Sequence, residues 1–274
     1  MIELNLYNGK EKITFDENRH IFYDGEGNKL LSVTAATGVI DKSGALMYWA
    51  TREAGAYILE ENEIVEKGYF DIYDKEEKKR RWRDLLKDLE DKQIETSALD
   101  LATGVLNGIK EYRARSRKAA DIGTIIHEWV SDWILKKNPK MPSDEKVVNG
   151  IMAFLKFQKE HKFKWLESER YIFSKKYRYA GILDSIAREG DKLVLVDFKS
   201  SNGIYDDMRF QVSGYKIAWE EETGRKIDER MILRFGKNDG EFEIRRLDND
   251  AKDKKAFLNC LALKNRLKEL DKKK

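Results

Sequence analysis

A short apolar run near residue 195 constrains the fold more than any other segment of the chain. Residues 192–199 read Lys-Leu-Val-Leu-Val-Asp-Phe-Lys, a composition typical of a β-strand. Because residues i and i+2 of a strand point to the same side, Asp197 and Lys199 share one face. Phe198 points the other way, toward packing. The strand therefore carries a carboxylate and an ammonium side by side near its end.

A second acid, Asp184, lies on the preceding strand. Residues 189–192 make a good four-residue hairpin loop if Arg188 pairs with Leu193. In that register Asp184 lies directly opposite Asp197, with the two Cβ atoms about 5 Å apart. Two carboxylates this close repel unless a cation lies between them, and Mg²⁺ or Mn²⁺ suits oxygen ligands. The alternative is a simple salt bridge between the lysine and one acid at the sheet edge.

Hydrophobic periodicity predicts the order of the other elements. We expect short strands within residues 2–31, helical spacing over 34–67 and 75–115, helices over 116–136 and 143–161, an antiparallel meander over 166–173, 179–187 and 193–199, a helix over 206–222, strands over 230–234 and 241–245, and a last helix over about 250–270. This order predicts an α/β core over residues 116–274, as one compact unit. Residues 1–115 form an N-terminal β-strand and helical region.

Composition excludes several classes of site. The only cysteine is Cys260, so the chain forms no internal disulfide and no cysteine-ligated zinc or iron–sulfur site. The net charge of +3 is small, so any basic surface must be local. No apolar run approaches the roughly 20 residues of a membrane span, and the N-terminus lacks a signal-peptide pattern. We therefore expect a cytoplasmic protein without a membrane partner.

Further polar residues occur in a fixed order around the acids. They are the pair Gly123-Thr124 followed by His127, the strand residue Glu169, Gly181 three residues before Asp184, and Gln211 with Tyr215 on one helix face. The set GT-x-x-H, E, G-x-x-D, D-x-K, Q-x-x-x-Y resembles the RecB-like branch of the PD-(D/E)XK nucleases over about residues 116–219. Residues 20–60 are more loosely similar to the mitochondrial genome maintenance exonuclease and its phage relatives.

The resemblance implies a fold and a set of roles. The fold is a PD-(D/E)XK, restriction-endonuclease-like core, with a central mixed sheet flanked by helices and an N-terminal β-hairpin and helical addition that covers the active site. It implies that Lys199 is the catalytic lysine and that Gln211 and Tyr215 order the site or touch DNA. Glu169 is preferred to the neighbouring Glu167 as a further catalytic acid. The implied metal ligands are His127, Asp184, Asp197 and the backbone carbonyl of Phe198.

Two other groups are candidates for contact with DNA. A basic run without intervening acids leads into the His127 helix and comprises Arg113, Arg115, Arg117 and Lys118. These cations either contact phosphates or line a solvated helix face. Ser32 and Thr34 either touch a phosphate, or Ser32 caps the helix that follows.

The resulting expectation is an Mg²⁺- or Mn²⁺-dependent exonuclease. It would hydrolyse phosphodiester bonds of single-stranded DNA or DNA ends in replication, recombination or repair, with replication or recombination proteins as further partners. Some members of the resembled branch carry a four-cysteine iron–sulfur cluster, which one cysteine cannot supply. The alternatives are an endonuclease or flap-cleaving enzyme on the same core, and a protein that binds DNA on a nuclease fold without cutting.

Overall fold

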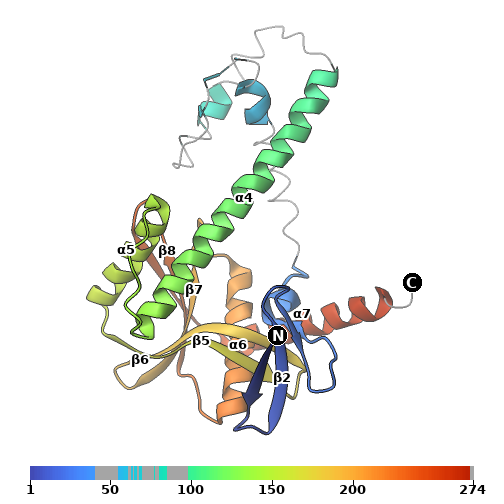
Figure 1. Ribbon diagram of the computed structural model, residues 1–274, viewed down its shortest axis with the longest axis vertical. Coiled ribbons are helices and arrows are strands. Elements are labelled where there is room, and N and C mark those ends of the chain that lie inside the picture. Colours follow the sequence, from blue (N-terminus) through green and yellow to red (C-terminus); the bar gives the residue numbers. More distant parts are fainter. Residues whose placement is uncertain are drawn as a thin grey trace. The chain divides into compact units, whose positions relative to one another are not determined.

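The computed structural model describes residues 1–40, 55–60, 63, 65–66, 68–69, 77, 80–84 and 98–271, without the side chains of residues 98–113 and 115. The chain forms two compact units, Met1–Ile40 with Ile122–Lys274, and Asp41–Asp121. In chain order the elements are β1 (Ile2–Leu6), β2 (Glu11–Asp16), β3 (Ile21–Tyr23), β4 (Leu31–Ser32), α1 (Val33–Thr37), α4 (Ala98–Ile134), α5 (Glu145–Glu160), β5 (Phe163–Ser174), β6 (Tyr179–Glu189), β7 (Lys192–Lys199), α6 (Asp206–Thr223), β8 (Glu229–Phe235), β9 (Phe242–Leu247) and α7 (Asp250–Asp271) (Figure 1).

A mixed six-stranded sheet forms the centre of the first unit. Its strand order is β4-β6-β7-β8-β9, and β5 also pairs with β6. The β5–β6, β6–β7 and β8–β9 pairs are antiparallel, as in the expected meander, whereas β4–β6 and β7–β8 are parallel. The helix α6 connects the parallel strands β7 and β8. The predicted α/β class, with helices flanking a mixed sheet, is therefore confirmed.

Helices cover both faces of this sheet (Figure 1). Along β7, Leu193 and Leu195 join a buried cluster that α6 and α7 complete. Val194, Val196 and Phe198 join a second buried cluster, which α5 and the C-terminal part of α4 complete. Burial on both faces explains why the strand is continuously apolar before its charged end.

The N-terminal strands belong to the same unit as the main sheet. The small sheet β1-β2-β3 packs Phe15 and Phe22 against Phe173 and Ala180 of β5 and β6. The short strand β4 then pairs with the start of β6. The sequence predicts a boundary at residue 115, and the structure instead places residues 1–40 with residues 122–274. The physical reason is this shared core, which joins segments far apart in the chain.

Helix boundaries differ from expectation at two places. The helix expected from residue 116 begins at Ala98, because Ser116 is flanked by strong helix formers and does not interrupt the helix. The helix expected from residue 143 is capped by Asp144, whose carboxylate accepts from the amides of Lys146 and Val147. The expected end of α6 is confirmed, since Gly224 is left-handed with φ 66°.

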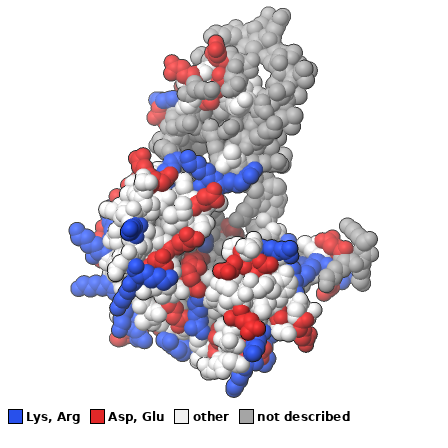
Figure 2. All heavy atoms as spheres, in the orientation of Figure 1, with Lys and Arg blue, Asp and Glu red and all other residues white. Residues whose placement is uncertain are grey.

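Surface charge and hydropathy agree with the composition. Lysine, arginine and acidic side chains are interspersed over the face of the described residues that Figure 2 shows. Within the described ranges, the structure has no helix long and apolar enough to cross a membrane.

Candidate metal centre

The two aspartates meet where β6 and β7 separate. Arg188 pairs with Leu193 as predicted, and the ladder ends at the pair Ser185 and Val196. Asp184 occupies the next position, and its Oδ2 accepts a hydrogen bond of 2.6 Å from the backbone amide of Phe198. The side chain thus takes the place of a ladder bond at the end of the hairpin. Asp184 is held in one position at the point where the two strands diverge.

Lys199 and Asp197 form a close ion pair. The Lys199 ammonium lies 2.5 Å from Asp197 Oδ2, and the Asp197 side chain is only 1% exposed. Phe198, between them, is buried in the opposite cluster, as the strand alternation predicts. The salt bridge that sequence offered as an alternative therefore exists. It does not replace the cluster of acids, because both aspartates converge on the same lysine charge.

His127 and Glu169 complete the cluster from two other elements. Ligand atoms of His127, Glu169 and Asp184 lie within 4.8 Å of one another. His127 Nδ1 is 3.8 Å from Asp184 Oδ1. One turn earlier on α4, a Cβ on Gly123 would lie 2.5 Å from Ser200 Oγ, so a larger residue there would displace the serine hydroxyl. The helix therefore passes close to the end of β7 at the glycine of the GT-x-x-H pattern.

The backbone of β5 resolves the choice between Glu169 and Glu167. Glu167 is occupied elsewhere, since Trp219 donates to its carboxylate at 3.0 Å and Arg170 lies 3.2 Å from it. Glu169 has φ 49°, a left-handed conformation inside a strand that costs a non-glycine residue about 1 kcal/mol or more. Strain of this kind concentrates at functional sites. The pairs Ser168–Ser185 and Arg170–Leu183 place Glu169 opposite Asp184 in the register of β5 and β6.

The carboxyl groups have raised pKa values. Burial and the nearby Asp184 raise the pKa of Glu169 to about 8, and Glu128 adds to the effect. Burial raises the pKa of Asp197 to about 6, with Asp184 adding and Lys199 opposing. Burial also raises the pKa of Asp184, although Lys199 and the Phe198 amide oppose it. Without a cation these acids resist ionising together.

The two basic groups respond in opposite directions. Burial and the charge of Lys199 lower the pKa of His127 to about 4, so the imidazole is neutral at physiological pH and available as a ligand. Burial lowers the pKa of Lys199, but the carboxylates of Asp197 and Asp184 outweigh this and raise it overall. The lysine therefore remains protonated.

Two acids that the sequence analysis did not single out also act on the site. Glu128, next to His127, raises the pKa of Glu169, and Asp207 raises that of Lys199. Asp207 lies in the first turn of α6, four residues before Gln211. The spacing of four residues puts Asp207 on the same helix face as Gln211, and this spacing could have predicted it as a site residue.

Tyr215 of α6 lies close to the acidic cluster, and Gln211 lies one turn earlier on the same helix. Tyr215 is buried, and its pKa is raised far above its usual range by burial and by the charges of Asp197, Asp184 and Glu169. A Cβ on Gly181 would lie 3.1 Å from both the Tyr215 ring and Val33, so this glycine allows three elements to meet. Gln211 Nε2 donates to Thr37 Oγ1 at 3.2 Å, which ties α6 to α1.

The remaining candidates divide into two groups. Ser32 Oγ accepts from the amide of Ala35 at 3.0 Å and so caps α1, and it also hydrogen-bonds Thr34 Oγ1. Arg117 and Lys118 are exposed on α4, whereas the side chains of Arg113 and Arg115 lie outside the described residues. Contact of any of these residues with DNA stays a prediction, as does the metal contact of the Phe198 carbonyl.

The donor set fits a hard divalent cation. Carboxylate oxygens suit Mg²⁺ and Mn²⁺, and a neutral imidazole favours Mn²⁺ among the two. The His127, Glu169 and Asp184 ligand atoms lie within 4.8 Å of one another, and opposite ligands of an octahedral Mg²⁺ lie about 4.2 Å apart, so small side-chain movements would let one cation contact all three. A dication would lower these carboxyl pKa values, since its charge offsets both the cost of burying ionised carboxylates and the repulsion of Asp184 with Glu169 and Asp197.

Comparison with known proteins does not identify a relative. No family model matches the chain, and no curated protein matches it. Among solved structures, the crystal structure of SSO0001 superposes with a TM-score of 0.29 and 13% identity. The superposition covers 43% of this chain and 57% of that protein. A similarity this small carries no argument about fold or function.

Stability of the metal-free protein should fall as the pH rises from 6.5 to 8. The pKa of Glu169 rises from 4.5 to about 8 on folding, and that of Asp197 rises from 3.8 to about 6. The folded state therefore binds more protons than the unfolded state, and it loses stability as the pH rises toward these folded pKa values. His127 has a lowered folded pKa, so it adds stability as pH rises from about 4 to 6.5. The two effects oppose below pH 6.5, and above it the loss through Glu169 dominates.

Thermal unfolding in EDTA at pH 6.5, 7.2 and 8 measures this dependence. The Glu169→Gln variant should show a smaller fall of the unfolding midpoint with pH above 6.5. In the wild-type protein at pH 8, added Mn²⁺ should return the midpoint to its value at pH 6.5. A midpoint that rises between pH 6.5 and 8 in EDTA would contradict the raised pKa of Glu169.

Proposed function

We propose that this protein is a metal-dependent nuclease with a RecB-like PD-(D/E)XK centre. The observation that carries the proposal is the convergence of Glu169, Asp184, Asp197 and Lys199 with His127 at the diverging end of a hairpin. Three acids with raised pKa values and one protonated lysine form a site for a divalent cation beside an anionic group. A phosphodiester supplies that anion.

The residues divide the work of hydrolysis among them. A bound Mg²⁺ or Mn²⁺ would supply Lewis acidity and a water of lowered pKa, with His127, Glu169, Asp184 and Asp197 as the available ligands. Asp184 is fixed by the Phe198 amide, so its free oxygen keeps one direction. Lys199, which stays protonated, stabilises negative charge that develops on the phosphorus oxygens rather than acting as a base.

The proposed substrate is DNA with a free end, and the reaction is exonucleolytic. The support is the resemblance of residues 116–219 to the RecB-like branch, together with the looser resemblance of residues 20–60 to the mitochondrial genome maintenance exonuclease. Both are resemblances of motif and order. The proposed setting is DNA replication, recombination or repair.

Digestion of linear and closed circular single-stranded DNA tests the proposal. We expect loss of end-labelled linear DNA with Mg²⁺ or Mn²⁺, no loss in EDTA, and intact circles. Cutting of circles would instead indicate the endonuclease. Absence of cleavage with either metal, on DNA or RNA, would contradict the proposed activity.

A further inference from the structure

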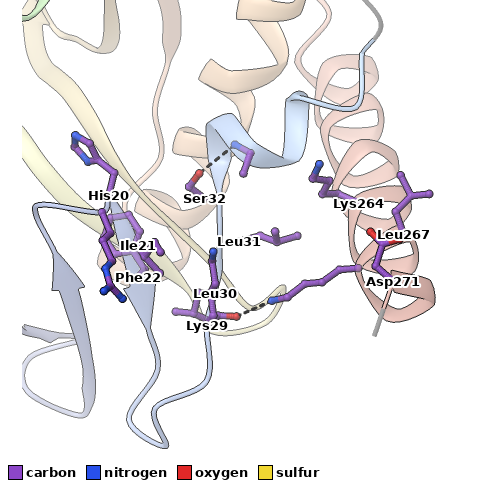
Figure 3. A pocket seen from close by; sticks show the side chains of 13 residues that line it. His20, Ile21, Phe22, Lys29, Leu30, Leu31, Ser32, Lys264, Leu267 and Asp271 are labelled. Atoms are coloured by element: carbon purple, nitrogen blue, oxygen red, sulfur yellow. Dashed lines mark hydrogen bonds between the residues drawn. The ribbon is translucent and has the colours of Figure 1, made fainter. Parts of the chain in front are cut away.

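A pocket of about 610 Å³ lies apart from the acidic cluster within the first unit. Its walls come from β3 and the turn before it, from the segment that ends in β4, from α1, and from the last turns of α7 (Figure 3). Figure 3 shows side chains of β3 on one side and of α7 on the other, with Leu30 and Leu31 between them. The volume lies in the range of small-molecule sites.

The pocket combines an apolar interior with a cationic rim. Ile21, Leu30, Leu31 and Leu267 contribute apolar surface, and Leu267 is 44% exposed although it is a large hydrophobic residue. The charged lining residues are Arg19, Lys29, Lys264, Lys268 and Asp271. Because Arg19 also lies 3.9 Å from Asp16, the lining keeps an excess of two positive charges. Lys268 donates to the backbone carbonyl of Lys29 at 3.1 Å and so closes one end (Figure 3). An occupant that complements this lining has a flat apolar part and a negative charge.

A nucleotide has both properties, because its base offers an apolar face and its phosphate an anion. The local excess of cations around the pocket favours an anionic occupant.

The pocket is joined to the proposed metal centre through α1. Ser32 lines the pocket and caps α1, while Val33 and Thr37 of the same helix face Gly181 and Gln211. One helix, about 10 Å across, therefore separates the pocket from the residues around Tyr215.

We propose that this pocket binds a nucleotide of the single-stranded substrate, across α1 from the bond that is cut. The inference rests on the proposed function and adds a second anchoring point on the same strand. It assigns Lys29 and Lys264 to phosphate contact and the leucines to contact with a base. A strand too short to reach from the metal centre across α1 gains nothing from the pocket.

Fluorescence anisotropy in EDTA tests the binding without cleavage. The probes are a labelled twelve-nucleotide oligothymidylate and a labelled trinucleotide, over a series of NaCl concentrations. The variant Lys29→Ala/Lys264→Ala removes two rim cations. The control Lys254→Ala/Lys255→Ala removes two exposed cations from the earlier turns of the same helix, so both variants lose the same charge.

We expect the pocket variant to bind the twelve-nucleotide probe about tenfold more weakly near 0.1 M salt. The slope of log affinity against log salt should shrink by about 1.4, because each phosphate contact on a single strand contributes about 0.7. The control variant should keep the wild-type slope, and the trinucleotide should bind all three proteins equally.

Several results would overturn the inference. They are equal slopes for the pocket and control variants, competition by poly-glutamate as strong as by the oligonucleotide, or thymidine monophosphate that binds as tightly as the twelve-nucleotide probe. The last would make the pocket a site for free nucleotides. Failure of the proposed nuclease activity would appear separately, as a wild-type protein that binds the long probe through the pocket but cleaves nothing with Mg²⁺ or Mn²⁺.

Discussion

Replacing Lys199 with alanine should lower metal-dependent cleavage about a thousandfold while leaving the fold intact. The ammonium lies 2.5 Å from Asp197, and it opposes the rise in the pKa of both aspartates. Its loss removes a charge that would stabilise the transition state, and it also makes the aspartates harder to ionise. Cleavage by the variant should therefore depend more steeply on pH, with the residual rate rising between pH 6 and 9.

Lys192→Ala is the matched control for this change. Lys192 lies at the other end of β7, where it pairs with Glu229 at 3.4 Å on the surface. We expect wild-type cleavage from it. Single-turnover rates with saturating Mn²⁺, together with circular dichroism spectra, make the comparison. Equal rates for Lys199→Ala and wild type would show that the lysine takes no part in cleavage.

Asp184→Asn should stabilise the metal-free protein and abolish its response to metal. Asparagine keeps an oxygen that can accept from the Phe198 amide at the same place. It removes a buried negative charge that repels Asp197, so the metal-free protein should become more stable. Many active sites show the same trade-off, in which a substitution gains stability and loses function. Wild type should gain about 2.7 kcal/mol from metal at a hundred times its Kd, or about 5–10 °C in Tm. The variant should gain almost nothing.

Differential scanning fluorimetry at pH 7.5 with EDTA, Mg²⁺ or Mn²⁺ measures both effects. Asp191→Asn is the control, because this substitution removes the same charge from an exposed position in the turn between β6 and β7. A Tm in EDTA that falls in Asp184→Asn but not in Asp191→Asn would show that Asp184 serves the fold rather than a cation.

The part of the site that sequence predicts is local. A four-residue turn fixes the register of β6 and β7, and this register alone brings Asp184 to the level of Asp197. The alternation of a strand then sets Lys199 beside Asp197 and buries Phe198. Apart from the start of α4, the helices and strands of the core were predicted to within a few residues for the same reason, since periodicity and turn residues are properties of short windows.

The rest depends on contacts between distant segments. The strand β4 has two residues, too few to show a period, yet its parallel pairing with β6 places residues 1–40 in the main unit. The left-handed conformation of Glu169 has no signal in the residues around it, since no glycine or asparagine stands there. The place of His127 beside Asp184 followed only from a resemblance of motifs, not from spacing. The sequence leaves open whether Ser32 caps a helix or contacts a phosphate. The hydrogen bond from the Ala35 amide to Ser32 Oγ shows that it caps α1.

The division of the chain into units has a consequence for how such a protein can vary. The first unit is discontinuous in sequence, because it comprises Met1–Ile40 and Ile122–Lys274. Residues 41–121 are therefore an insertion within it. Every residue of the acidic cluster, and every residue of the neighbouring pocket, comes from outside that insertion. Exchange or lengthening of the inserted segment would therefore leave every residue of the proposed metal centre and of the pocket in place.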